Sequence, residues 1–136
     1  MTIVADASAV ASFLIPDEAD SFSHFARERC LTDAVHVPAH WPVELANVLW
    51  KAYRRKRFSA EDRDQIVRLA GEFHGIVTVN TDVEIVPLFE RAIRSGLTAY
   101  DTGYLALAER LGAPLLTRDG DLARIASQAG ISVLAP

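Results

Sequence analysis

Four acidic side chains interrupt apolar or amphipathic stretches of the chain, and their type and position could support chemistry. Asp6 directly follows the apolar run TIVA, and Asp119 follows LLT with one residue between them. Both runs are typical of strands, and ligands of open parallel sheets bind beyond the carboxyl ends of the strands. Each acid taken alone could equally be the N-cap of the helix that follows, because aspartate is a preferred N-cap residue. Their positions therefore indicate a site and leave the capping role open.

The other two acids, Glu44 and Asp101, lie in predicted helices. Glu44 lies near the start of the amphipathic stretch 40–57, at the edge of its apolar face, where an acid also favours the helix dipole. Asp101 shares a helix face with the apolar residues at positions −4, +4 and +7 from it. A carboxylate on an apolar face is costly unless it is paired or liganded. The alternative for Asp101 is a capping interaction with Thr98.

Mutual repulsion becomes decisive if the four acids meet in one cleft. At separations of about 5 Å and an effective dielectric constant of about 20, each of the six pairs repels by roughly 3 kcal/mol. The sum, on the order of 20 kcal/mol, exceeds the usual stability of a domain. Cations must then neutralise the cluster, and oxygen-only ligands select Mg²⁺ or Mn²⁺. Such a site suits hydrolysis of phosphodiesters.

Composition and length indicate one domain spanning residues 1–136. Half of the residues are apolar and 24% are charged, which supports a buried core. The net charge of −4 does not by itself indicate a nucleic-acid binder. No stretch reads as a membrane span or a signal peptide, and the single cysteine, Cys30, cannot form an internal disulfide. We therefore expect a cytoplasmic protein.

The elements that must position the acids alternate between strand and helix patterns, which predicts a three-layer α/β/α sandwich with a five-stranded, mainly parallel sheet. Strands are predicted at 2–5, 35–37, 76–79, 115–117 and 131–134. Helices are predicted at 8–14, 17–31, 40–57, 59–75, 81–96, 98–112 and 121–129. Capping boxes are expected from Ser59 with Asp62 and from Thr81 with Glu84. Pro87 should kink the latter helix or delay its start.

At these residues the chain resembles the PIN-domain ribonucleases, and most closely the VapC-type toxins of bacterial toxin–antitoxin pairs. The matching segments are VADASAV at the start, PVELANVL at 42–49, TAYDTGYLALAERLGAPLLTRDGDL at 98–122, and the closing ISVLAP. They span the whole chain, and the third is the most specific. The resemblance implies a metal-dependent endoribonuclease on a parallel sheet with flanking helices.

The resemblance also implies roles for individual residues. Asp6 and Asp101 match the most direct metal ligands, and Glu44 and Asp119 complete a set of four catalytic acids that hold Mg²⁺ or Mn²⁺. Three neighbours are expected to orient carboxylates or water: Ser8, Asn47 and Thr117. Asp121 could reach the metals through water or could start the last helix. The implied reaction is in-line attack of an activated water on the phosphodiester, leaving 5′-phosphate and 3′-hydroxyl ends.

Basic residues are expected to hold the RNA, since an anionic substrate must approach an acidic cleft. The candidates are Lys51, Arg54, Arg55, Lys56, Arg57 and Arg118. For the cluster at 51–57 the alternative is a solvated helix end, where cations are favoured.

The four histidines are scattered without ligand spacing. The aromatic residues Trp50 and Tyr53 fit core or interface positions better than base-stacking positions.

The resemblance implies two protein partners: a VapB-like antitoxin whose carboxy-terminal arm covers the acidic cleft, and a second copy of the chain in a homodimer.

A phosphate-accepting receiver domain or an aspartyl phosphatase would need a lysine near the later strands, and the only lysines are Lys51 and Lys56. The alternative that stays open is a PIN-like module that binds RNA or protein without cutting.

Overall fold

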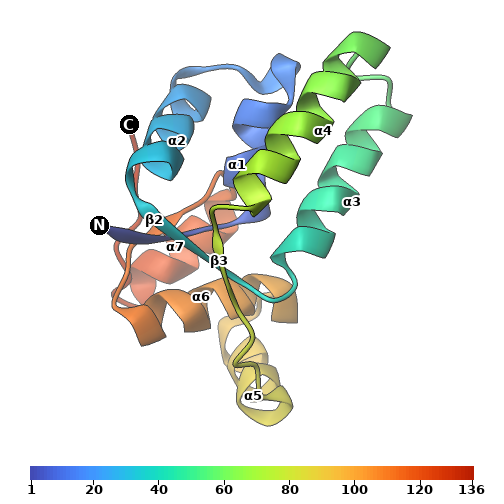
Figure 1. Ribbon diagram of the computed structural model, residues 1–136. Coiled ribbons are helices and arrows are strands. Elements are labelled where there is room, and N and C mark those ends of the chain that lie inside the picture. Colours follow the sequence, from blue (N-terminus) through green and yellow to red (C-terminus); the bar gives the residue numbers. More distant parts are fainter.

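Four short parallel strands form the centre of the structure, a computed structural model that describes residues 1–136 (Figure 1). β1 (Thr2–Ala5) pairs with β2 (Ala34–Pro38) on one side and with β4 (Leu115–Leu116) on the other. β3 (Thr78–Asn80) pairs with the far side of β2, which gives the order β3-β2-β1-β4. The side chains of the central strand β1 are almost wholly buried, as expected of a parallel sheet covered on both faces.

Helices cover the sheet and complete the predicted α/β class. They are α1 (Ala7–Leu14), α2 (Ser21–Thr32), α3 (Trp41–Arg54), α4 (Ala60–His74), α5 (Ile85–Ser95), α6 (Ala99–Leu111) and α7 (Gly120–Gln128), with a short 3₁₀ turn η1 (Pro16–Glu18). α1 packs against α2, α3 and α4, while α6 packs against β1 and β2 and carries α5 on its outer side (Figure 1). The parallel sheet between helical layers is thereby confirmed.

The sheet has four strands where five were predicted. Residues 131–134 form a single parallel bridge, between Val133 and Leu115, in place of a strand. Leu115 donates its N–H to Ser132, and its carbonyl accepts from the N–H of Leu134. β4 is only two residues long, so it offers no further backbone groups with which a fifth strand could pair.

Helix starts follow the capping residues, with two corrections. The predicted helix 17–31 is split, because Asp20 forms a capping box with Ser23 and so begins α2 after η1. The capping box of Ser59 with Asp62 is confirmed. The one expected from Thr81 is wrong, since α5 begins at Ile85 with no side-chain cap. Pro87 falls in the first turn of α5, where proline is tolerated.

Helix α5 buries little of its apolar surface. It has no buried residue, and Ile85, Val86, Phe89 and Ile93 are all more than half exposed. Its packing partner is α6. An apolar stripe of this size on a surface helix is typical of an interaction surface.

No helix in the structure has the length and apolar character needed to cross a membrane.

Candidate active site

The candidate site lies at the carboxyl edge of the parallel sheet. Asp6 follows β1, and Asp119 lies just beyond β4, while the first turns of α3 and α6 supply Glu44 and Asp101. Burial is the main cause of the raised pKa values of Asp6, Glu44 and Asp101, and charges add to it: that of Asp119 acts on Asp6 and Asp101, and those of the other three acids act on Glu44. The structure therefore brings together four side chains that span more than a hundred residues of sequence.

Asp6 is the most buried of the four acids, with 3% of its surface exposed. Its Oδ1 accepts hydrogen bonds from Ala9 N at 2.9 Å, as the N-cap of α1, and from Ser8 Oγ at 2.7 Å. Its Oδ2 accepts from Thr117 Oγ1. Burial raises the pKa of Asp6 to about 6 even though these hydrogen bonds favour the ionised form.

Two hydroxyl groups connect Asp6 to the loop after β4. Ser8 Oγ accepts from Arg118 N at 3.0 Å, and Thr117 Oγ1 accepts from Asp119 N at 3.0 Å. Each hydroxyl therefore donates to the Asp6 carboxylate while it accepts from the backbone of the 117–119 loop. This arrangement fixes both oxygens of Asp6, as expected for groups that orient a ligand.

Asp119 is the N-cap of α7 and leaves one of its carboxylate oxygens free. Its Oδ1 caps α7 by accepting from Asp121 N at 2.9 Å and Leu122 N at 3.2 Å, and its Oδ2 has no hydrogen bond within the protein. Asp121 itself lies in the first turn of α7, and its side chain is exposed beside Arg124. That placement agrees with Asp121 as a helix-start residue.

Asp101 leaves its carboxylate similarly available. Thr98 caps α6 by accepting from Asp101 N at 3.2 Å, but the side chain of Asp101 makes no reciprocal bond. Burial, and then the charge of Asp119, raise the pKa of Asp101. A hydrogen bond with the Thr98 side chain partly offsets this rise, and the Asp101 carboxylate does not complete a capping box.

Glu44 lies where three buried polar atoms lack partners: Glu44 Oε2, His40 Nε2 and the Tyr104 hydroxyl. The distance from His40 Nε2 to Glu44 Oε2 is 3.8 Å, too long for a hydrogen bond. Burial, followed by the charges of Asp6 and Asp101, raises the pKa of Glu44 to about 7, although the nearby Tyr104 hydroxyl partly offsets this rise. Burial and the Glu44 charge raise the pKa of Tyr104 in turn.

His40 is a site neighbour that the sequence reasoning missed. Its ring packs edge-on against Tyr100 and Tyr104, with centroids 5.4 and 5.2 Å apart, and burial lowers its pKa. A Cβ at Gly103 would lie 2.7 Å from His40 Cε1, so the ring occupies the space that this glycine leaves. The spacing of four residues between His40 and Glu44 was the sequence signal that could have indicated it.

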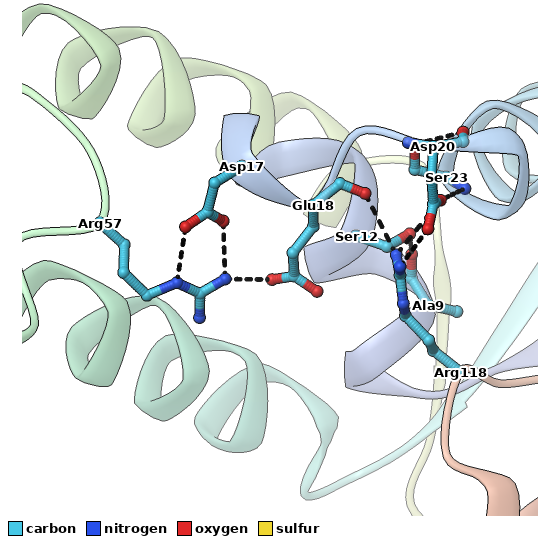
Figure 2. Close-up of polar contacts among 8 residues, drawn as sticks. All are labelled: Ala9, Ser12, Asp17, Glu18, Asp20, Ser23, Arg57 and Arg118. Carbon is cyan, nitrogen blue, oxygen red and sulfur yellow. Dashed lines mark hydrogen bonds and ion pairs between the residues drawn. The ribbon is translucent and has the colours of Figure 1, made fainter.

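The predicted RNA-binding residues divide into engaged and free groups. Arg57 binds both oxygens of Asp17, at 3.0 and 2.7 Å, and Glu18 at 3.0 Å (Figure 2). Arg118 binds the Asp20 carboxylate and the Glu18 carbonyl (Figure 2). Its guanidinium also lies over the ring of Phe22. Both guanidinium groups are therefore already engaged in ion pairs with acids of this chain.

The remaining basic candidates are exposed and form no ion pair: Lys51, Arg54, Arg55 and Lys56. Asn47 is exposed one turn beyond Glu44 and makes no side-chain hydrogen bond to an acid. Trp50 and Tyr53, expected in a core or interface, are about half exposed, so they do not belong to the core.

A cavity of about 450 Å³ adjoins the site between α5, α6 and the ends of β2 and β3. His40 and Gly103 border it on the site's side, and Arg94 lies on the α5 side. None of the four acids lines this cavity. The acidic cluster is therefore a separate surface feature next to it.

The donor set fits a hard divalent cation. Its oxygens are all carboxylate oxygens, burial and neighbouring acids raise the pKa values of Asp6, Glu44 and Asp101, and Glu44 Oε2 is buried without a partner. As placed, no group of three or more His, Cys, Asp or Glu side chains is close enough to hold a metal ion. To hold an ion together, the acids would have to lie closer to one another than they do here.

Comparisons with known proteins identify the fold and the sequence family. A family model described as PIN domain matches residues 3–128. "Ribonuclease VapC3" of Pyrobaculum aerophilum is 34% identical over 126 residues, covering 90% of this chain and 93% of that protein. "Ribonuclease VapC12" of Mycobacterium tuberculosis is 32% identical over 131 residues, covering 90% of each chain.

Two solved structures share the fold. PAE2754 from Pyrobaculum aerophilum superposes with a TM-score of 0.71 at 23% identity, over 92% of this chain and 84% of that one. VapC20 of Mycobacterium tuberculosis, described as a toxin that cleaves the sarcin–ricin loop, has a TM-score of 0.65 at 18% identity, over 98% and 99% of the two chains. At these identities the two structures support the fold alone.

Proposed function

This chain belongs to the PIN-domain family, among the VapC-type ribonucleases, and from that premise we propose that it is the endoribonuclease toxin of a type II toxin–antitoxin pair. The proposed site is made of Asp6, Glu44, Asp101 and Asp119. The observation that supports it most is their placement at one edge of the sheet, where the charges of the other three acids act on Glu44 and that of Asp119 acts on Asp6 and Asp101.

The proposed cofactor is Mg²⁺ or Mn²⁺. Asp119 Oδ2 and Glu44 Oε2, which have no protein hydrogen bond, and the carboxylates of Asp6 and Asp101 would hold it. When bound, such an ion polarises the phosphate and makes water more acidic. Without it, at least part of the cluster must remain protonated near neutral pH, because burial disfavours several negative charges in one place.

The chain's own groups would position the reactants. Ser8 and Thr117 hold Asp6 in one orientation, so this acid contributes a fixed pair of oxygens. Glu44 would offer Oε2 to the ion, since no protein group bonds that oxygen, and in the absence of the ion burial and the neighbouring acids raise its pKa to about 7.

Substituting Asp101→Asn tests the proposal. The variant keeps the shape of the side chain and the backbone bond to Thr98, and we expect at least a 100-fold loss of Mg²⁺-dependent RNA cleavage with unchanged far-UV circular dichroism. Asp64→Asn, an exposed acid on α4, is the charge-matched control. Sequencing of the RNA ends should show 5′-phosphates. Cleavage that survives Asp101→Asn, or that ignores EDTA, would contradict the proposal. A chain that binds RNA without cutting it would be the silent PIN-like module.

The partners follow from the same proposal. We expect a VapB-like antitoxin that presents a basic side chain to the acidic cleft, because an unpaired cation would relieve the repulsion there. We also expect a homodimer. The exposed apolar stripe of α5 supports self-association, since it is a surface that a second protein could cover. An RNA substrate is consistent with action in the cytoplasm.

A further inference from the structure

The outward face of α3 carries aromatic side chains that the candidate site does not use. Trp50 is 51% exposed and Tyr53 is 54% exposed. The guanidinium of Arg54 lies 5.0 Å from the centre of the Trp50 ring, and that of Arg63, on α4, lies 6.0 Å from the Tyr53 ring. Two exposed rings, each beside a cation, therefore lie together where α3 meets α4.

Free positive charge is concentrated at the same place. Of the 14 lysines and arginines in the chain, seven form ion pairs with acids. Five of the seven others belong to this end of α3 and the start of α4: Lys51, Arg54, Arg55, Lys56 and Arg63. The acids nearby in sequence are Glu61, Asp62 and Asp64, and Asp62 is used in the capping box of α4. None of the three pairs with these cations, so the surface offers unneutralised charge in a chain of net charge −4.

Helix α3 connects this surface to the site, because Glu44 lies in its first turn. Lys51 and Arg55 follow Glu44 by seven and eleven residues, which places them on the same line of the helix. At a rise of 1.5 Å per residue they lie about 10 and 16 Å from Glu44 along the axis. Trp50 and Arg54 occupy the adjacent line, facing solvent. A strand leaving the site along α3 would meet cations on one line and aromatic surface on the next.

We propose that Trp50 and Arg54 form a stacking platform for a base of single-stranded RNA, with Lys51 and Arg55 contacting its phosphates, two to three helical turns from the acids. This inference rests on the proposed function, because it assigns a binding surface to the RNA strand that the site would cut. Stacking on an aromatic ring accepts any base, and arginine adds a cation–π contact. Unpaired cations around the rings favour RNA over an apolar protein surface as the occupant.

Binding of RNA by the full-length chain tests the platform separately from cleavage. The parent is the Asp101→Asn variant in EDTA, and the probe is a fluorescently labelled single-stranded 12-mer measured by anisotropy. We expect Trp50→Ala to weaken binding about 5- to 150-fold, the range for loss of one stacked base, and Trp50→Phe to retain most of it. Because Trp50 is half exposed, we expect both variants to fold, and their melting temperatures should be close to that of the parent.

Salt dependence tests the phosphate interactions. Lys51→Ala combined with Arg55→Ala should lower the slope of log K against log salt by about 1.4, at about 0.7 for each phosphate of a single strand that is no longer neutralised. Arg27→Ala, which removes an exposed unpaired cation from α2, is the matched control and should leave the slope unchanged. Intrinsic fluorescence gives a second reading, since Trp41 is 1% exposed and RNA should quench Trp50 alone.

The outcomes separate this inference from the proposed function. If the wild-type chain cuts RNA but Trp50→Ala binds the probe as tightly as the parent, the platform is wrong and the nuclease stands. If Trp50→Phe is as weak as Trp50→Ala, stacking is not the interaction. Unchanged RNA binding together with weaker self-association in light scattering would assign the surface to a protein interface and overturn the inference. A wild-type chain that cuts no RNA counts against the proposed function instead.

Discussion

Replacing Glu44 with glutamine should stabilise the protein at alkaline pH while it impairs the site. Glu44 Oε2 is buried without a hydrogen-bond partner, and the neighbouring acids oppose its ionisation. A neutral side chain of the same shape removes this unfavourable charge and breaks no hydrogen bond that Oε2 makes. The increase in stability therefore measures the cost of burying this charge, to which repulsion from the neighbouring acids adds.

The magnitude follows from the pKa. Folding raises the pKa of Glu44 from 4.5 to about 7. At about 1.4 kcal/mol per pKa unit, full ionisation destabilises the fold by about 3 kcal/mol at most. About a quarter of the side chain remains exposed, so solvent screening reduces the expected value to about 1–3 kcal/mol. For a chain of this length that corresponds to roughly 3–10 °C in melting temperature.

The direction of the Glu44 pKa shift determines the pH range over which stability changes. A folded-state pKa above the unfolded value means that the folded chain binds the proton more tightly. Wild-type stability should therefore fall between about pH 4.5 and pH 7 through this group, and the variant should lack that fall. The two proteins should have similar stability at pH 4 and differ most at pH 8.

Thermal melts of both proteins at pH 4, 6 and 8, with and without Mg²⁺, make the comparison. Mg²⁺ should stabilise the wild-type chain at pH 8 more than the variant, because a ligand that binds only the folded state raises its stability. Glu28→Gln on α2, an exposed acid, is the control and should change stability by less than about 0.5 kcal/mol. A Glu44→Gln variant that is no more stable than wild type at pH 8 would refute the argument that burial and neighbouring acids disfavour the Glu44 charge.

Two further predictions concern the groups around the acids. Thr117→Val removes the hydroxyl that donates to Asp6 and should weaken Mg²⁺ binding about 10- to 100-fold by calorimetric titration, whereas Thr117→Ser should preserve it. Gly103→Ala places a methyl group 2.7 Å from His40 Cε1 and should lower the free energy of unfolding in urea by about 1–3 kcal/mol. Gly71→Ala, where nothing lies within 4 Å of the new methyl group, should instead raise it by about 0.5–1 kcal/mol. Equal effects of the two alanine substitutions would contradict the close packing at Gly103.

Residue type, together with position after a strand for two acids and on a helix face for the other two, was enough to select the four candidates, because these are local properties of the sequence. Asp6 and Asp119 follow apolar runs, and the parallel arrangement of strands brings their ends to one edge. The same local rules predicted the N-caps, so both acids act as caps and also face the site. The expected fifth strand did not form, because pairing depends on how much of β4 is extended.

Tertiary structure alone decided which charges are free. Arg57 and Arg118 are basic residues like their neighbours, yet their partners Asp17 and Asp20 lie 40 and 98 residues away in the sequence. Helical spacing placed Trp50 on a face of α3 but could not show that no element covers it. Local patterns set the direction of a side chain along its helix or strand, whereas burial and ion pairing depend on the elements that pack against it. For this protein the sequence alone indicated which residues could form the site, and packing determined which surfaces remain available to a substrate.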